Sequence, residues 1–437
     1  MPATDGVDDS TPKTLTVGLL GCGIVGSGVV RLLREHADEI AGRIGARLEV
    51  GPVAVRTLSR DRAVEGLALT ADPHAVTTDP SVDIVVEVMG GIEPTRGLIA
   101  EALEAGKSVV TANKELIATL GADLFALAGT RGVRLEYEAA VAGGIPIIRP
   151  LRESLAGDRV RKVLGILNGT TNYILTKMTE EGSSFADALG EAQRLGYAER
   201  DPTADIEGFD AAAKTAILAS LAFDAKVVAG DVYREGITAV TATDIAHARR
   251  MGYVIKLLGI AEQVDGTIGA RVYPALIPAT HPLASVRESF NAVFVEAEAV
   301  GDLMFYGRGA GSLPTASAVV GDIVTVARAL LSGERPGAGG VMADKPLRPF
   351  DENTVQFSIL LDVLDQSGVL AAVAATFGEH DVSIKSVWQE GAGDTAQLLL
   401  ITHAATERDV QATLHGLREL PMVRAVASVI RVEGGEV

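Results

Sequence analysis

Three charged residues within ten positions have the types and spacing for acid–base chemistry. Asp205, Asp210 and Lys214 lie in a run of small and apolar residues that continues to Leu221. On a helix that begins near Asp205, the last two share one stripe with the apolar residues Ile206, Ile217, Leu218 and Leu221. An exposed Asp/Lys pair of this spacing contributes only roughly 0.2–0.5 kcal/mol, whereas charges on a core-facing side are costly unless paired and are tolerated in clefts. The pattern therefore favours a functional site in a cleft over a solvated surface pair.

A glycine-rich motif follows the first apolar run and has the features of a nucleotide site. Leu15–Leu20 is followed directly by GCGIVG, and a helical pattern begins within that motif. Glycines permit a tight turn and close backbone approach, and N–H groups at a helix start can bind a pyrophosphate. Such turns also join strands to helices for packing alone, but a position within about 20 residues of the start of the fold favours a dinucleotide. The candidate cofactor contacts are Gly21, Gly23, Ile24, Val25 and Gly26.

The second apolar run, VGPVAVR, bears on the choice of cofactor. It ends at Arg56, with Arg60 four residues on, where an acidic residue normally holds the ribose hydroxyls. An arginine at this place favours the 2′-phosphate of NADP(H), and a surface arginine after a strand is the alternative. The missing carboxylate argues against strict use of NAD(H) without excluding it.

These motifs together resemble homoserine dehydrogenases. The run from Ala192 to Lys214 is similar to the signature of that family, with Asp201-Pro202, Asp205-Ile206, Gly208 and Asp210 at the family's spacing. Further similar segments are GLLGCGIVGSGVV at 18–30, VTANKELIA at 110–118, YEAAVAGGIPII at 137–148, ILNGTTNYIL at 166–175 and GRGAGSLPTASAVVGD at 307–322. The resemblance covers Thr14 to Leu331, and the residues after 352 resemble an ACT domain.

The resemblance implies a reaction and residues for it. The reaction is the NAD(P)H-dependent interconversion of L-aspartate 4-semialdehyde and L-homoserine, in threonine and methionine biosynthesis. Lys214 would exchange the proton with the carbonyl or hydroxyl oxygen, and Lys114 would lie near the nicotinamide and the substrate. Glu199 and Asp210 would hold the substrate's amino group, because an ammonium needs an anionic partner.

The resemblance also implies further cofactor contacts and a cation site. Gly196 and Gly311 would contact the cofactor with Lys114, for which the alternative is a solvated lysine near a helix start, an unfavourable place for a cation. A monovalent cation, Na⁺ or K⁺, would bind Glu138 and backbone carbonyls of Val141, Gly143 and Ile145. The Glu138 carboxylate could as easily satisfy neighbouring N–H groups at a strand end.

The elements that must position these residues fall into several domains. Over residues 14–149, short apolar runs alternate with helical segments, which predicts a Rossmann-like, doubly wound α/β sheet of parallel strands. Residues 150–331 mix alanine- and leucine-rich helices with β-like runs, which predicts an α+β domain for substrate binding and dimerisation. Its last helix, Leu313 to Leu331, is expected to pack back on the first domain.

The C-terminal part is predicted to be a separate regulatory domain. Residues 332–352 have the glycine and proline content of a linker. Residues 353–437 follow a βαββαβ order, typical of a ferredoxin-like sandwich and here interpreted as an ACT domain. Its loop Asp365–Leu370 joins a strand to a helix and could receive an effector's carboxylate. The family implies threonine as effector, and a cap and turn that serve only dimerisation is the alternative. Sheet edges that pair with a second copy predict a homodimer or homotetramer.

Composition limits the other classes of function. With 437 residues, 47% of them hydrophobic, the chain is long enough for two or three domains. The net charge of −18 opposes binding to nucleic acid. The single cysteine, Cys22, allows no intramolecular disulfide and fits a reducing compartment. Residues 1–13, expected to be a disordered tail, lack the pattern of a signal peptide, and the uncharged stretch 14–30 is short for a membrane span. We therefore expect a cytoplasmic protein with no membrane partner.

Two other functions are weighed against this one. Another semialdehyde oxidoreductase with a Rossmann start would not be expected to carry the ordered Asp-Pro, Asp, Asp and Lys series. A non-catalytic sensor that binds dinucleotide and amino acid would be expected to lose a lysine, whereas Lys114 and Lys214 are both present.

Overall fold

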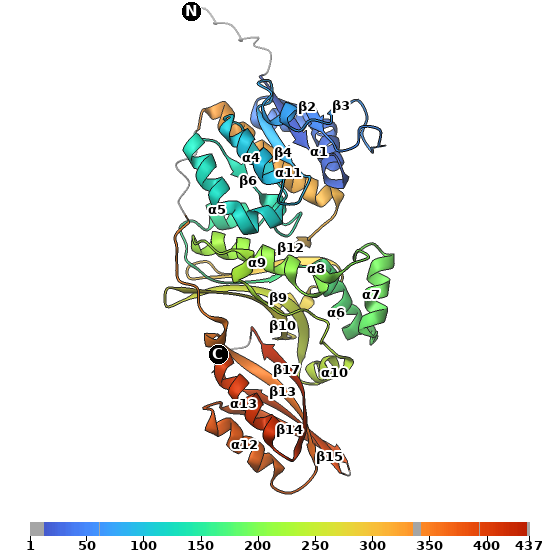
Figure 1. Ribbon diagram of the computed structural model, residues 1–437, viewed down its shortest axis with the longest axis vertical. Coiled ribbons are helices and arrows are strands. Elements are labelled where there is room, and N and C mark those ends of the chain that lie inside the picture. Colours follow the sequence, from blue (N-terminus) through green and yellow to red (C-terminus); the bar gives the residue numbers. More distant parts are fainter. Residues whose placement is uncertain (1–12, 61, 335–341, 393, 435–437) are drawn as a thin grey trace, which may run out of the picture. The chain divides into compact units, whose positions relative to one another are not determined.

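A computed structural model describes residues 13–60, 62–334, 342–392 and 394–434 of the chain (Figure 1). The described residues form two compact units. Unit 1 comprises Met1–Arg149 and Ala310–Ala343, and unit 2 comprises Pro150–Gly309 and Asp344–Val437. Residues 1–12 of the expected tail and 335–341 of the expected linker lie outside the described residues.

Unit 1 contains the predicted parallel sheet. Within the described part of the chain it has six strands in the order β3-β2-β1-β4-β5-β6, all parallel. The strands are β1 (Thr14–Leu20), β2 (Arg47–Ala54), β3 (Ala68–Thr70), β4 (Ile84–Glu87), β5 (Ser108–Thr111) and β6 (Leu135–Glu136). Most of these strands are apolar and rich in β-branched residues, as is typical of parallel strands with helices on both faces of the sheet. The order reverses between β1 and β4, and in such sheets ligands bind beyond the carboxyl ends of the strands at this point.

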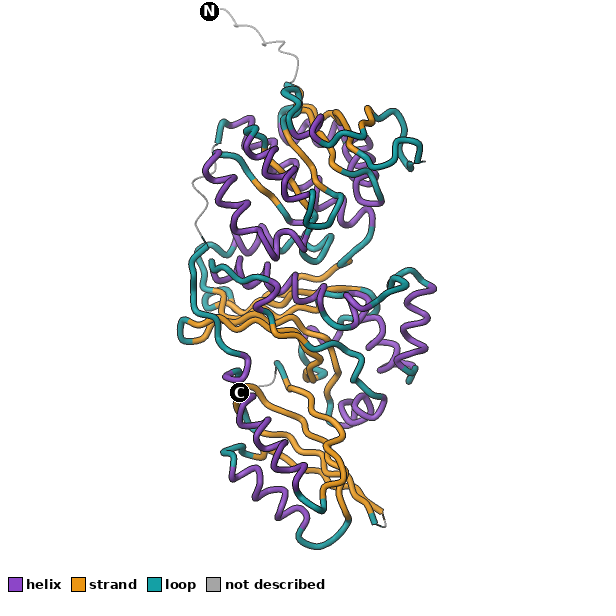
Figure 2. The backbone as a smooth tube through the Cα atoms, in the orientation of Figure 1, coloured by secondary structure: helices purple, strands orange, loops and turns teal. Residues whose placement is uncertain are grey.

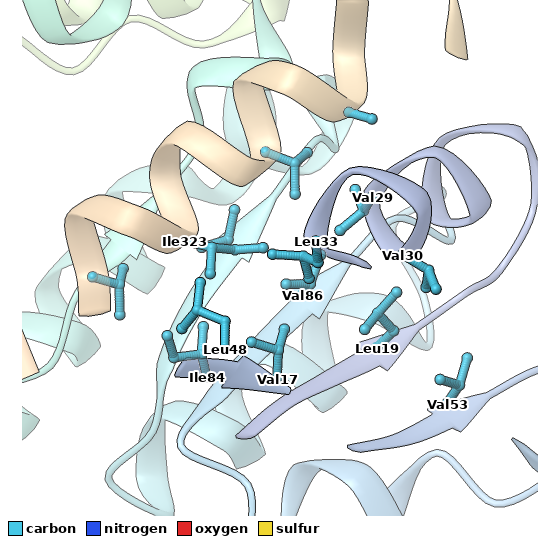
Figure 3. Close-up of a cluster of buried hydrophobic side chains, with 14 of the residues drawn as sticks. Val17, Leu19, Val29, Val30, Leu33, Leu48, Val53, Ile84, Val86 and Ile323 are labelled. Carbon is cyan, nitrogen blue, oxygen red and sulfur yellow. The ribbon is translucent and has the colours of Figure 1, made fainter. Parts of the chain in front are cut away.

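The helices of unit 1 pack on this sheet, and α1, α2 and α11 share one apolar core with it. They are α1 (Ile24–Glu35), α2 (Ala37–Ile44), α3 (His74–Thr77), α4 (Thr95–Glu104), α5 (Lys114–Arg131) and α11 (Ser312–Ser332). Figure 3 shows Ile323 of α11 beside Leu33 of α1 and Val86 of β4, in the cluster that forms the core. A Cβ on Gly28 of α1 would lie 3.0 Å from the Ala316 Cβ of α11, so glycine permits this close helix packing.

Helix α11 therefore packs on the first domain, as expected. Residues 310–331 were assigned to the second domain from sequence, whereas the compact units group them with unit 1. The physical reason is the buried side of the helix, which includes Ala316, Val319, Ile323 and Val326. By length and composition α11 is the one helix among the described residues that could cross a membrane. Most of its buried residues lie in the core of unit 1, and buried residues make up 39% of its apolar window.

Unit 2 is built on a mixed sheet. Its first part has the strand order β12-β11-β7-β9-β10, with all four pairings antiparallel. The strands are β7 (Val160–Ile166), β8 (Tyr233–Arg234), β9 (Tyr253–Val264), β10 (Thr267–Pro278), β11 (Phe290–Ala297) and β12 (Gly301–Arg308). The helices are α6 (Gly169–Glu181), α7 (Phe185–Arg194), α8 (Thr203–Ile206), α9 (Phe209–Phe223) and α10 (Ala242–Arg250). Short helical turns occupy Glu138–Ala140 in unit 1 and Pro150–Ser154, Ala229–Asp231, Pro282–Ser285 and Phe350–Glu352 in unit 2.

The C-terminal part of unit 2 has the predicted βαββαβ order (Figure 2). Its elements are β13 (Thr354–Leu364), α12 (Val369–Glu379), β14 (Ile384–Ala392), β15 (Thr395–Thr402), β16 (Ala405–Thr406), α13 (Glu407–Glu419) and β17 (Val423–Val432). The order β17-β13-β15-β14 and its antiparallel pairings are those of a ferredoxin-like sandwich. Helices α12 and α13 cover one face, where Phe357, Leu400 and Leu414 are buried.

A buried ion network connects this C-terminal sheet to β7 and β10. Strand β17 pairs with β10 over only two residues, and Glu433, directly after β17, accepts hydrogen bonds from Tyr273 Oη at 2.6 Å and Lys162 Nζ at 2.7 Å. Arg271 lies 3.3 Å from the same carboxylate. Burial would raise the pKa of Glu433, but Lys162 and Arg271 outweigh it and hold the pKa at about 2. Breaking such a buried network leaves uncompensated charge, which typically costs about 3–5 kcal/mol.

Candidate active site

The glycine loop of unit 1 joins β1 to α1 in a conformation that leaves room for a ligand. Gly21 has a φ of +101°, and a Cβ there would lie 3.0 Å from the backbone oxygen of Val88. A Cβ on Gly26 would lie 2.5 Å from the Gly21 oxygen, whereas one on Gly23 would meet nothing within 4 Å. Gly21 and Gly26 are therefore required by the turn itself. Gly23 instead leaves open space beside the first N–H groups of α1, which have no partner inside the helix.

A cavity of about 780 Å³ opens at this loop, within the size range of cofactor sites. Its lining includes Gly21 and Gly23 and, from the residues that follow β2, Arg56 and Arg60. Both arginines are exposed. An anion-binding helix start and two cations on one cavity fit a phosphorylated dinucleotide.

Two residues that sequence reasoning missed shape this cavity. Glu87, at the end of β4, accepts backbone N–H bonds from Met89 and Gly90 and a hydroxyl bond from Thr111. Its buried carboxylate thus fixes the turn that lines the cavity, and its signal was an acidic residue in the otherwise apolar run IVVEVM. Arg62 also lines the cavity and donates to the backbone oxygens of Thr57, Leu58 and Arg60.

Lys114 and Gly311 each lie at a helix start in unit 1. Lys114 is the first residue of α5 and half-buried, directly after Asn113, whose side chain accepts a bond from the Leu116 N–H and donates to the Gly91 oxygen. It follows β5 as the glycine loop follows β1, so both lie at the carboxyl edge of the sheet. Gly311 precedes α11 with a φ of +120°.

In unit 2, Lys214 is buried and held by two oxygens. Its Nζ donates to Asp210 Oδ2 and to the backbone oxygen of Leu167, each at 2.7 Å. Asn168 donates to the same Asp210 oxygen at 2.9 Å and to Asp205 Oδ1 at 2.7 Å. Burial raises the pKa of Asp205, against the lowering effect of the Asn168 hydrogen bond. The structure thus brings the three predicted charged residues together through Asn168, which sequence reasoning missed although its segment was noted.

The predicted helix from Asp205 is wrong in one respect. A short helix, α8, ends at Ile206, and Gly208 with a φ of +79° separates it from α9, which begins at Phe209. The left-handed turn at Gly208 breaks the helix. Nearly all residues of α9 are buried, so Asp210 and Lys214 lie in a buried helix and not on one stripe of an amphipathic one.

Glu199 and Gly196 lie on the loop between α7 and α8. Both are exposed, and Gly196 has a φ of +77°. The loop is joined to the start of α6 because Thr170 donates to the backbone oxygen of Tyr197. Lys214, Gly196, Glu199 and Asp210 thus belong to unit 2, whereas Lys114 and Gly311 belong to unit 1.

Glu138 has partners other than a cation. One of its carboxylate oxygens accepts N–H bonds from Ile147 and Ile148, and the other accepts from the backbone and side chain of Arg149. Four donors use both lone pairs of each oxygen, so in this arrangement the carboxylate does not fit as a cation ligand. Val141, Gly143 and Ile145 lie in the tight turn that follows, where Ala142 and Gly143 have positive φ. No group of three or more His, Cys, Asp or Glu that could hold a metal ion occurs in the described ranges.

Asp322 is a further buried acid near Glu138. Burial and the charge of Glu136 raise its pKa to about 8. One oxygen accepts the Glu138 N–H at 2.8 Å, and Arg149 lies 3.4 Å from the other. It connects α11 to the segment that Glu138 organises.

The Rossmann sheet of unit 1 has an open glycine loop beside a cavity lined by arginines, and unit 2 holds a buried lysine paired with a carboxylate. These features are those of a nicotinamide-dependent oxidoreductase. Residues 21–138 match the family model described as homoserine dehydrogenase, NAD binding domain, and residues 146–324 match that described as homoserine dehydrogenase. The chain belongs to the homoserine dehydrogenase family.

Relatives and solved structures agree over nearly the full chain. The homoserine dehydrogenase of Corynebacterium glutamicum is 51% identical over 425 residues, with 95% of both sequences covered. That of Mycobacterium tuberculosis is 51% identical, with 97% of this chain and 98% of the relative covered. The crystal structure of a homoserine dehydrogenase from Thiobacillus denitrificans superposes with a TM-score of 0.92 at 43% identity and covers 97% of this chain and 99% of its own.

We expect Lys214→Ala to lower kcat by roughly 10²- to 10⁴-fold, the usual cost of removing a general acid. The comparison is steady-state turnover of homoserine by the wild type, by Lys214→Ala and by Lys226→Ala, in which an exposed lysine just after α9 is removed. Retained binding of the cofactor by Lys214→Ala would separate lost chemistry from unfolding. Near-normal turnover in this variant would contradict a catalytic role for the lysine.

Proposed function

We propose that the chain catalyses the NAD(P)H-dependent interconversion of L-aspartate 4-semialdehyde and L-homoserine, in the cytoplasm and as a step of threonine and methionine biosynthesis. The observation that carries the proposal is the buried Lys214 ammonium, held on Asp210 and the Leu167 oxygen inside the segment that matches the family model. We assign the cofactor to residues of unit 1, with Gly196 as a further contact, and the substrate to unit 2.

Lys214 is proposed as the proton donor to the substrate oxygen. When bound, the nicotinamide supplies the hydride for the aldehyde carbon and accepts it in the reverse direction. Reduction places negative charge on the carbonyl oxygen, which a fixed ammonium stabilises and protonates. Described residues accept two of the three N–H bonds that the Lys214 ammonium can donate, and we assign the third to this oxygen. Asp210 and Asn168 keep the ammonium in one position.

The substrate's own ammonium is assigned to carboxylates. Glu199 and Asp210 are the proposed partners, and Asp205, on the same Asn168 amide as Asp210, adds a further acidic group. Such charge-assisted hydrogen bonds favour a zwitterionic amino acid over an uncharged aldehyde or alcohol. Lys114, half-buried at the carboxyl edge of the unit 1 sheet, is proposed to contact the substrate beside the nicotinamide.

For the cofactor we propose NADP(H), with NAD(H) as the alternative. The pyrophosphate would bind the start of α1, at Gly21, Gly23, Ile24, Val25 and Gly26. Arg56 and Arg60 on the same cavity support a 2′-phosphate. A hyperthermophilic archaeal homoserine dehydrogenase in complex with NADPH, 27% identical to this chain with a TM-score of 0.61, is in line with this choice.

For residues 353–437 we propose an ACT regulatory domain that binds threonine. The support is the ferredoxin-like strand order and the loop Asp365–Leu370, in which Gly368 has a φ of +92° and precedes α12. Strand β14 is an edge strand of the sheet, and such an edge can pair with a second copy in a homodimer or homotetramer. Removal of the whole domain is a poor test, because it would take away Glu433 and leave the buried Arg271 and Lys162 without it.

The function is tested by following nicotinamide absorbance with the purified full chain. We expect oxidation of L-homoserine with NADP⁺ and reduction of L-aspartate 4-semialdehyde with NADPH. L-Serine, which has one carbon fewer, should give little turnover because its hydroxyl carbon lies closer to the ammonium. Absence of turnover with both substrates and both cofactors would contradict the proposal.

Cofactor choice is tested by Arg56→Ala. We expect the KM for NADPH to rise about tenfold or more, which corresponds to about 1.4 kcal/mol, with little change for NADH. Arg47→Ala, at the opposite end of β2, is the matched control and should leave both constants unchanged. An equal rise for NADPH and NADH would show that Arg56 does not bind the 2′-phosphate.

Feedback is tested in the full chain by Gln366→Ala in the loop before α12. We expect threonine to inhibit the wild type and the inhibition constant to rise about tenfold or more in the variant, or about 1.4 kcal/mol. Gln411→Ala on α13 is the control, since it also removes one amide from the same domain. A wild type that threonine does not inhibit would contradict threonine feedback through this domain.

A further inference from the structure

A second, smaller cavity lies in unit 2, between α10 and the C-terminal sheet. Its volume is about 140 Å³. Helix α10 and the residue after it contribute His247, Arg250 and Met251; strands β14 and β15 contribute Trp388, Glu390, Gln397 and Leu399. The register pairs Trp388 with Leu399 and Glu390 with Gln397, and Leu398 and Leu400 on either side of Leu399 point into the core under α12 and α13. The cavity therefore lies on the other face of the sheet. We call it the α10 pocket.

The rim of the α10 pocket carries opposite charges side by side. Arg250 Nη1 donates to both oxygens of Glu390, at 2.6 and 2.7 Å, and Arg250 Nη2 lies 2.8 Å from His247 Nδ1. The two side chains of the ion pair remain 52% and 65% exposed. An ion pair this exposed contributes little to stability, so exchanging it for the charges of a ligand costs little.

The floor of the α10 pocket is apolar. Met251 and Leu399 lie there with the indole of Trp388, which remains 46% exposed although it is the only tryptophan of the chain. An apolar cavity of about 150 Å³ admits a benzene-sized molecule of six heavy atoms. The space thus suits an aliphatic side chain of a few carbons and excludes a nucleotide or a large aromatic ligand.

We propose that the α10 pocket binds a free α-amino acid with a small aliphatic side chain. The carboxylate replaces Glu390 on Arg250, the ammonium binds Glu390, and the side chain packs on Trp388, Met251 and Leu399. A zwitterion is the one small-ligand class that matches both rim charges together with an apolar floor. The site is separate from the loop Asp365–Leu370 proposed for threonine, and binding to it does not depend on the proposed catalytic function.

The α10 pocket is connected to Lys214 through packed helices and strands of unit 2, so binding there would affect the lysine site. The ligand would join α10 to β14, and α10 packs against α6 and β9. Asn168, directly before α6, holds Asp205 and Asp210, and β9 packs against α9, which carries Lys214. A change in the KM for homoserine is therefore expected to accompany binding.

The test uses the intrinsic fluorescence of Trp388 in the full chain. We expect L-valine, L-threonine and L-methionine, titrated one at a time, to give a saturable change in emission. Isobutylamine and isobutyrate, which each carry only one of the two charges, should give none at the same concentrations. Arg250→Gln and Glu390→Gln should each weaken binding about tenfold or more, whereas Arg249→Gln, which alters an exposed neighbour on α10, should bind as the wild type does.

Binding at the α10 pocket should survive in Gln366→Ala, and isothermal calorimetry checks every affinity independently of the fluorophore. A signal lost in Gln366→Ala but retained in Arg250→Gln and Glu390→Gln would assign the ligand to the loop Asp365–Leu370 and overturn the proposal. Absence of saturable fluorescence and of heat for all three amino acids would also overturn it. So would a signal that follows protein concentration rather than ligand, since a second copy would then cover Trp388. If the wild type did not turn over homoserine, that result would contradict the proposed function but not the binding of an amino acid at the α10 pocket.

Discussion

The need to satisfy one buried ammonium, that of Lys214, organises the first part of unit 2. Lys214 lies in a helix that is apolar on almost all sides, and a charge in such a place is costly unless paired and hydrogen-bonded. Its partners come from Asp210 one turn earlier and from the backbone oxygen directly after β7. Asn168 then fixes Asp210 and Asp205 while its own side-chain oxygen caps α6. One ammonium thus sets the mutual positions of α6, α8, α9 and the end of β7.

Strand β7 connects this site to the C-terminal sheet. Near one end of the strand, Lys162 binds the buried Glu433 beside Arg271, and just beyond the other end Leu167 accepts the bond from Lys214. Both contacts are buried and charged, so neither can be lost without leaving a charge uncompensated. The C-terminal βαββαβ segment is therefore held to β7 and β10 by an ion network as well as by the two-residue strand pairing. The C-terminal segment and the lysine site thus both contact β7 or the residue that follows it.

Unit 1 is subject to a different constraint, because its close-packed fold must leave space for a ligand. Gly21, Gly26 and Gly28 are needed for the turn and for the contact of α1 with α11. Gly23 is surrounded by open space, and the buried Glu87 carboxylate fixes the turn at Met89 and Gly90 that lines the same cavity. Some glycines of this motif are therefore required for packing, whereas Gly23 leaves space beside the start of α1.

Local patterns in the sequence were sufficient for the parallel sheet, the glycine loop, the βαββαβ order and the grouping of Asp205, Asp210 and Lys214, because periodicity and turn residues act over a few positions. The same patterns misplaced the start of α9, since the break depends on the backbone conformation of Gly208. Tertiary structure alone decided the pairing of Asn168 with Asp205 and Asp210, of Glu138 with Asp322, and of Lys162 with Glu433. These partners lie 37 to 271 residues apart. No local periodicity specifies such pairs, because the requirement to satisfy a buried charge is met only by whichever groups the complete fold brings near it.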